Sequence, residues 1–97
     1  MTFSINALNI KYRVTNRGVN AKANILFDGI AVGYIDDIAE AITTTVKFKR
    51  PENRDEFLKD SYEWKRELSI NGDDYRISEY ARYLMAKSEQ DYLERTK

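Results

Sequence analysis

Hydrophobic and polar residues alternate along the first half of the chain, as they do in strands with one buried face. The alternating segments are 8–15, 21–28, 30–35 and 42–48. Asp28 and Gly29 stand between the second and third segments, and this pair is typical of a type I′ hairpin turn. Gly33 inside the third segment predicts a bulge or a close backbone approach. We therefore expect four antiparallel strands joined as a meander.

The hydrophobic period changes after Pro51, which suits the first turn of a helix because its missing N–H has no helical partner there. The first helical stripe comprises Phe57, Ser61, Trp64 and Leu68, and Asn71-Gly72 is expected to end that helix. Ser78 is then expected to cap a second helix. The stripe of that helix comprises Ala81, Leu84, Met85, Ser88 and Tyr92.

This element order, ββββαα, predicts a single domain over residues 1–97 with an α+β fold. We expect an antiparallel four-stranded sheet with both helices packed on one face. Leu8, Ile10, Tyr12 and Val14 form the apolar side of the first strand. Trp64 and Phe27 are expected at the contact between helices and sheet.

Composition narrows the possible functions. The sequence contains no histidine and no cysteine, so the usual general base, thiolate nucleophiles and the commonest zinc ligands are absent. We expect no enzymatic activity, no catalytic residues, no cofactor and no metal. No apolar run approaches the length of a membrane span and no secretion signal is evident, so we expect a cytoplasmic protein that does not interact with membranes.

The formal net charge is zero, with 16 basic and 16 acidic residues, which argues against a nucleic-acid binder held by phosphate contacts. The charges are unevenly spread along the chain. Residues 1–34 carry four bases and one acid, whereas residues 35–74 carry eleven acids and seven bases. The acidic middle is the clearest regional bias.

Three acids in the stretch GYIDDIAEAI, namely Asp36, Asp37 and Glu40, follow the third strand directly. A metal site, a helix start and a partner-binding face are the alternatives. Adjacent residues of an extended chain point to opposite sides and no calcium-loop spacing surrounds them, which disfavours the metal site. We expect the strand to end before these residues and Asp36 or Asp37 to cap a short helical turn, an arrangement compatible with partner binding.

The first predicted helix supplies the remaining candidates. Its acids recur at spacings of three and four residues, which place neighbours on a common stripe. They could form an ordinary solvated face, partly neutralised by Lys59 and Arg66, or a carboxylate array that mimics DNA phosphates. The candidate partner-binding residues are Asp36, Asp37, Glu40, Glu52, Asp55, Glu56, Asp60, Glu63 and Glu67.

Basic residues of the first two strands offer another surface. Lys11, Arg13 and Lys22 could bind single-stranded nucleic acid, or they could form a solvated sheet face. Because Tyr12 shares the apolar side with Ile10, the solvated face is the favoured interpretation.

The chain length, the absence of histidine and cysteine, and the segment RGVNAKANILFDGIAVGYIDDIAEAITTTVKF together resemble small prophage-encoded inhibitors. Specifically, the chain resembles type I-F anti-CRISPR proteins, which bind the Csy surveillance complex and block it from engaging DNA. The resemblance implies a phage-derived protein, acting in a bacterial host cell, whose acidic surface occupies a basic DNA site. The neutral net charge departs from a typical DNA mimic, so we expect a local acidic face. The alternatives are a regulatory module for another host protein and a direct nucleic-acid binder.

Overall fold

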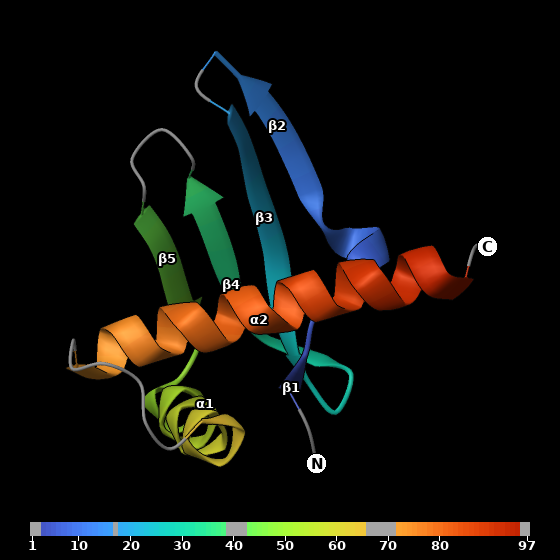
Figure 1. The fold of residues 1–97 in the computed structure, drawn as a ribbon. Coiled ribbons are helices and arrows are strands. Elements are labelled where there is room, and N and C mark those ends of the chain that lie inside the picture. The colour runs from blue at the N-terminus through green and yellow to red at the C-terminus, as the bar shows by residue number, and fades with distance from the viewer. Residues whose placement is uncertain (1–2, 17, 39–42, 66–71, 96–97) are drawn as a thin grey trace.

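The computed structural model describes residues 3–16, 18–38, 43–65 and 72–95, and it has the expected α+β fold (Figure 1). Both helices contact the same antiparallel sheet. The elements are β1 (Phe3–Ser4), the 3-10 turn η1 (Ala7–Asn9), β2 (Lys11–Thr15), β3 (Gly18–Phe27), β4 (Ile30–Ile38), β5 (Thr43–Phe48), α1 (Pro51–Trp64) and α2 (Gly72–Arg95).

The strand β3 organises the sheet. The strand order is β1-β3-β4-β5, and β2 pairs with the other part of β3, so the described sheet has five strands instead of the four expected. The additional strand is β1, where Phe3 lies opposite Phe27. A two-residue strand is too short for alternation to reveal it. The predicted meander from β2 to β5 is confirmed.

The turn between β3 and β4 is the hairpin turn that the sequence predicts. Asp28 has φ 51° and Gly29 has φ 85°, and a type I′ turn requires positive φ at both positions. The expectation for Gly33 is also confirmed. A Cβ at Gly33 would lie 2.3 Å from the carbonyl oxygen of Lys47, and the β3–β4 register shifts between Ile25 and Leu26.

Phe57 of α1 is the centre of the hydrophobic core. Its ring is fully buried, and its centroid lies 4.9 Å from that of Phe3, 5.2 Å from that of Phe48 and 4.9 Å from that of Tyr80. Trp64, placed at the helix–sheet contact from the sequence, is only partly buried and stacks on α2 instead. Residues 57 and 64 lie on nearly the same side of α1, but Trp64 is two turns farther along the helix, where its ring meets Tyr80 and Tyr83 of α2.

The apolar side of β2 is not buried as expected. Tyr12 is 53% exposed, Val14 is 81% exposed and Leu8, which lies in η1, is 72% exposed, whereas Ile10 is buried. Figure 1 shows the physical reason, because α2 crosses the lower part of the sheet and the β2–β3 hairpin projects beyond it. Alternation identifies the side of a strand, but not how far the covering helix extends.

The second helix begins earlier than expected, at Gly72, so Ser78 lies inside it and is not its cap. Asp73 and Asp74 occupy the first helical turn, where carboxylates favour the positive end of the helix dipole. Pro51 stands at the start of α1, as predicted. The first helix ends at Trp64, followed by an extended Lys65, and not at Asn71-Gly72 as expected. Leu68 lies outside the described residues.

Arg76 joins the two helices. Its side chain is buried, and its guanidinium donates hydrogen bonds to the backbone carbonyls of Ser61, at 3.1 Å, and Lys65. The guanidinium carbon also lies 3.9 Å from the centre of the Tyr62 ring. The last turn of a helix has carbonyls without helical partners and carries partial negative charge. Arg76 therefore caps α1 from α2.

Candidate functional site

Four acids of α1 lie on one side of the helix. Glu52, Glu56, Asp60 and Glu63 are separated by four, four and three residues, so they form a continuous line, which we name the acidic stripe. Phe57 and Ser61 occupy the buried side of the helix. The core therefore directs the acidic stripe outward, as the sequence predicts.

The acidic stripe is not neutralised by neighbouring cations within the described residues. Glu52, Glu56 and Glu63 are exposed, and no salt bridge involves any member of the stripe among residues 3–16, 18–38, 43–65 and 72–95. Lys59, which could neutralise part of the acidic face, forms no salt bridge with Asp55 or Glu56 in this part of the chain. Asp55 is exposed one position away from the stripe. Arg66 lies outside the described residues.

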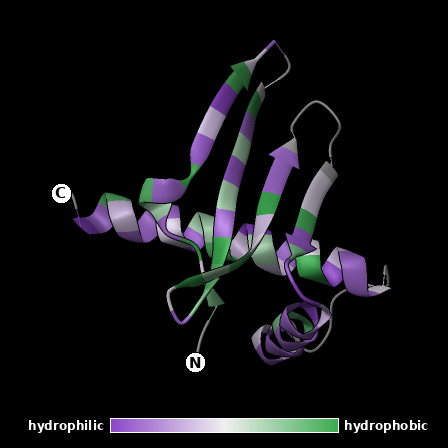
Figure 2. Cartoon of the chain, turned by 180° about the vertical axis from the view of Figure 1, so that it is seen from behind, coloured by the Kyte–Doolittle hydropathy of each residue, from purple (hydrophilic) through white to green (hydrophobic). Residues whose placement is uncertain are grey.

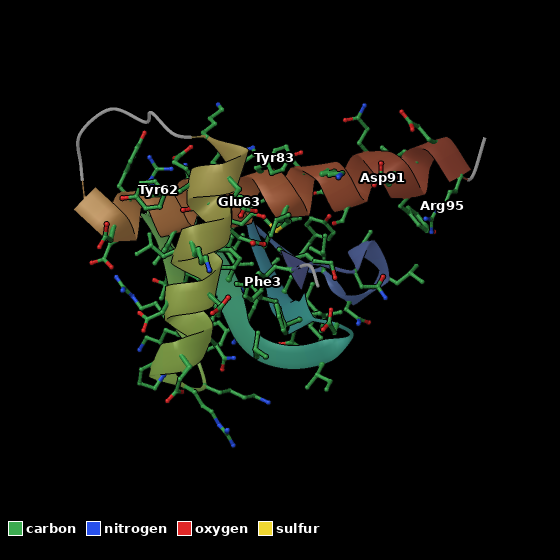
Figure 3. The ribbon with its side chains drawn as sticks, turned by 90° about the horizontal axis from the view of Figure 1, so that it is seen from below. Phe3, Tyr62, Glu63, Tyr83, Asp91 and Arg95 are labelled. Carbon is green, nitrogen blue, oxygen red and sulfur yellow. The ribbon has the colours of Figure 1, made fainter. Side chains whose placement is uncertain are left out.

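A cleft of about 490 Å³ adjoins the end of the stripe. It lies between α1 and α2 with β1 beneath, and Figure 3 shows Glu63 and Tyr83 where the two helices cross and Asp91 farther along α2. The lining residues are Phe3, Ser4, Ile5, Asp60, Glu63, Trp64, Tyr80, Tyr83, Leu84, Lys87, Ser88 and Asp91. Three carboxylates and one ammonium line it, so the cleft favours cationic groups.

Stacked aromatic rings form one wall of this cleft. The centre of the Trp64 ring lies 5.2 Å from that of Tyr80 and 5.0 Å from that of Tyr83. The Tyr80 hydroxyl donates a hydrogen bond of 3.5 Å to a carboxylate oxygen of Asp60. Exposed aromatic side chains beside carboxylates are suitable anchors in protein–protein interfaces.

Burial and neighbouring carboxylates raise the pKa of two groups at this end of α1. Burial raises the pKa of the Asp60 carboxyl above its usual 3.8, and the nearby charges of Glu63 and Glu56 raise this pKa further, while the Tyr80 hydrogen bond opposes the shift. Burial and the Asp60 carboxylate raise the pKa of Tyr80 to about 12. The N-terminal ammonium lowers the pKa of Asp60 without cancelling the rise, and a cation from a partner would lower it further.

The acids of the GYIDDIAEAI stretch do not extend the stripe. Asp36 and Asp37 lie within β4, which continues to Ile38, so neither caps a helical turn. Figure 1 shows this end of β4 on the far side of α2 from α1. The strand pairs with β3 and β5 through both residues, and ladder hydrogen bonds on each side favour the extended backbone.

The two aspartates point to opposite faces of the sheet. Asp37 accepts a hydrogen bond of 2.9 Å from the Thr44 hydroxyl and lies 3.6 Å from the Arg82 guanidinium of α2. Arg82 Nε also donates to the Thr44 hydroxyl at 2.6 Å. Asp37 therefore contributes to the contact between α2 and the sheet. Asp36 points to the opposite face of the sheet, which the helices do not cover.

Of the nine candidate residues, the structure brings together the four of the stripe, with Asp55 beside them, and separates Asp36 and Asp37 from them. Glu40 and Glu67 lie outside the described residues. Sequence reasoning missed Asp91 as part of the cleft. This residue comes from α2, and no local pattern indicates that α2 crosses α1 at this point.

Among the described residues, no group of acidic side chains is arranged to hold a metal ion, and no helix is both long and apolar enough to cross a membrane. Comparison of the chain with protein-family models, with curated proteins and with solved structures finds no match.

Proposed function

We propose that this protein is a non-enzymatic inhibitor that binds a protein partner through the acidic stripe and occupies that partner's basic nucleic-acid site. The observation that carries the proposal is the line of four carboxylates on α1, none of which has a salt bridge within the described residues. Such an array presents negative charge at regular intervals, and lysines and arginines that bind phosphates recognise it in the same way.

The local character of the array fits a neutral protein. At physiological salt the Debye length is about 8 Å, so charges beyond the contact region contribute little to binding. Bases distant from α1 therefore do not cancel the attraction of a basic partner to its five acids, which outnumber Arg54 and Lys59 on the same helix. The cleft beside the stripe adds aromatic area from Trp64 and Tyr83, which stabilises a complex that charge steers into place.

The resemblance to type I-F anti-CRISPR proteins makes the Csy surveillance complex the first partner to test. The direct experiment measures binding of the protein to this complex, and cleavage or binding of target DNA in its presence. The variant Glu52→Gln/Glu56→Gln/Glu63→Gln removes three exposed charges while keeping the size and helix propensity of the side chains. We expect it to melt near the parent temperature and to lose most of its binding.

The matched control is Asp28→Asn/Asp73→Asn/Glu94→Gln, which removes three exposed charges outside α1. It should bind like the parent protein, and target DNA should compete with the parent protein. Equal binding by both triple variants would refute the role of the stripe. Simultaneous binding of DNA and protein at their normal sites would refute occupancy of the DNA site. Absence of any binding to the Csy complex would direct the search to another basic host protein.

A further inference from the structure

The face of the sheet opposite the helices is a second charged surface. Ala21, Ala23 and Ile25 of β3 are buried toward the helices, so the alternate residues of β3 point to the other face. Figure 2, which views the molecule from behind, shows the strands crossing in front of α2 on this side. We name this surface the open sheet face.

Positive charge is concentrated on the open sheet face. The register places Lys11 opposite Lys22, and Arg13 follows Lys11 on the same side of β2. Lys47 of β5 lies opposite Tyr34 of β4. The four basic side chains are all exposed, and Asp36 is the acid that shares this face within the described strands. The surface therefore carries a local net charge of +3, from four bases and one acid.

An aromatic ring lies among these charges. Tyr34 is half-buried on β4, an inner strand of the sheet, and the Lys22 ammonium lies 5.2 Å from the centre of its ring. A pocket of about 210 Å³ beside the ring is lined by Asn24, Gly33, Tyr34, Lys47, Phe48 and Lys49. Lys22 and Lys47 lie on β3 and β5, the strands on either side of Tyr34.

We propose that the open sheet face binds single-stranded nucleic acid, with a base stacked on Tyr34 and phosphates on Lys11, Arg13, Lys22 and Lys47. The positive charge favours a polyanion. The aromatic ring and its adjoining pocket favour a single strand over a duplex, because the bases of a single strand are free to stack on the ring. The amide of Asn24 beside the ring can donate to or accept from a base edge. This surface does not include α1, so the proposal does not depend on the acidic stripe.

The experiment measures the fluorescence anisotropy of labelled twelve-nucleotide oligo-dT, oligo-U and a twelve-base-pair duplex between 50 and 200 mM salt. Four phosphate contacts at a slope of about 0.7 each predict that single-strand binding weakens roughly 50-fold over this range. Lys22→Gln/Lys47→Gln should reduce the salt slope by about half. Tyr34→Leu should weaken binding about five- to 150-fold, the value of one stacked base.

Two matched controls lie elsewhere on the molecule. Lys59→Gln/Lys87→Gln removes two exposed ammonium groups from the helices, and Tyr12→Leu removes an exposed ring from the opposite side of the sheet. Both should bind like the parent protein. Binding to neither single strand at 50 mM salt would overturn the proposal, as would duplex binding of equal strength or equal losses in the controls. The lysine variants keep the test decisive if Tyr34→Leu unfolds.

Discussion

The substitution Phe57→Ala tests whether the core is organised around α1 as the structure shows. Phe57 is fully buried and touches rings from β1, β5 and α2, so no single neighbour can collapse into the space left by its ring. Replacing a buried phenylalanine by alanine costs about 3–5 kcal/mol. A domain of this length is stabilised by roughly 5–15 kcal/mol in total. The variant should therefore lose a large fraction of its free energy of unfolding.

Urea denaturation provides the measurement. Trp64, the single tryptophan, stacks on Tyr80, which touches Phe57, so its fluorescence reports unfolding of the core alongside far-UV circular dichroism. With a denaturant slope of about 1–2 kcal/mol per molar, the transition midpoint should fall by roughly 1.5–5 M, or the variant should be unfolded without urea. Ile30→Ala, at a position that is 69% exposed, should change the free energy of unfolding by no more than about 0.5 kcal/mol. A folded Phe57→Ala protein with a midpoint within roughly 0.5 M of the parent would refute the assigned core.

Three further predictions concern single groups. Gly33→Ala should destabilise the fold by about 1–3 kcal/mol in urea denaturation, because its Cβ would collide with the Lys47 carbonyl, and an unchanged midpoint would contradict that close approach. Because the folded pKa of Asp60 is raised, its contribution to stability is present below the unfolded pKa and is lost as pH rises through the folded value. Asp60→Asn should therefore stabilise the protein at pH 7 but not at pH 3. Thermal melts at both pH values measure this, and stabilisation at pH 3 but not at pH 7 would contradict the direction of the Asp60 pKa shift. Tyr80, with its pKa raised to about 12, should be the last of the seven tyrosines to ionise in an ultraviolet titration, and stability should fall as pH rises from about 10 through 12. Loss of the delayed step in Tyr80→Phe identifies the group, and its persistence would show that the assignment is wrong.

The parts of the fold that could be predicted from the sequence are those that depend on local chemistry. The Asp28-Gly29 turn requires positive φ at two successive positions, and few residue pairs other than this one provide it. Pro51 and the acids after it mark the start of α1. The side of each strand also follows from alternation, as the buried Ala23 shows.

The remaining features depend on where distant elements meet. Whether Tyr12 is covered depends on the direction in which α2 crosses the sheet, and β2 itself contains no information about that direction. The pair Asp36 and Asp37 resembles a helix start locally, yet pairing with two neighbouring strands keeps it extended. The acidic stripe could be predicted because it lies on one helix, whereas the cleft beside it needs α2 and β1 as well.

The position of Arg76 makes the two helices one cooperative unit. Its guanidinium bonds the carbonyls at the end of α1 from the first turns of α2, so fraying of either helix breaks the same hydrogen bonds. Local opening in proteins follows such units, and amides within one unit exchange with solvent at a common free energy. The backbone amides at the end of α1 and those around Arg76 should therefore show the same free energy of hydrogen exchange, although the two segments are separate in the sequence. The acidic stripe thus belongs to a helix whose C-terminal end is held by α2, which favours a constant spacing of the carboxylates near that end.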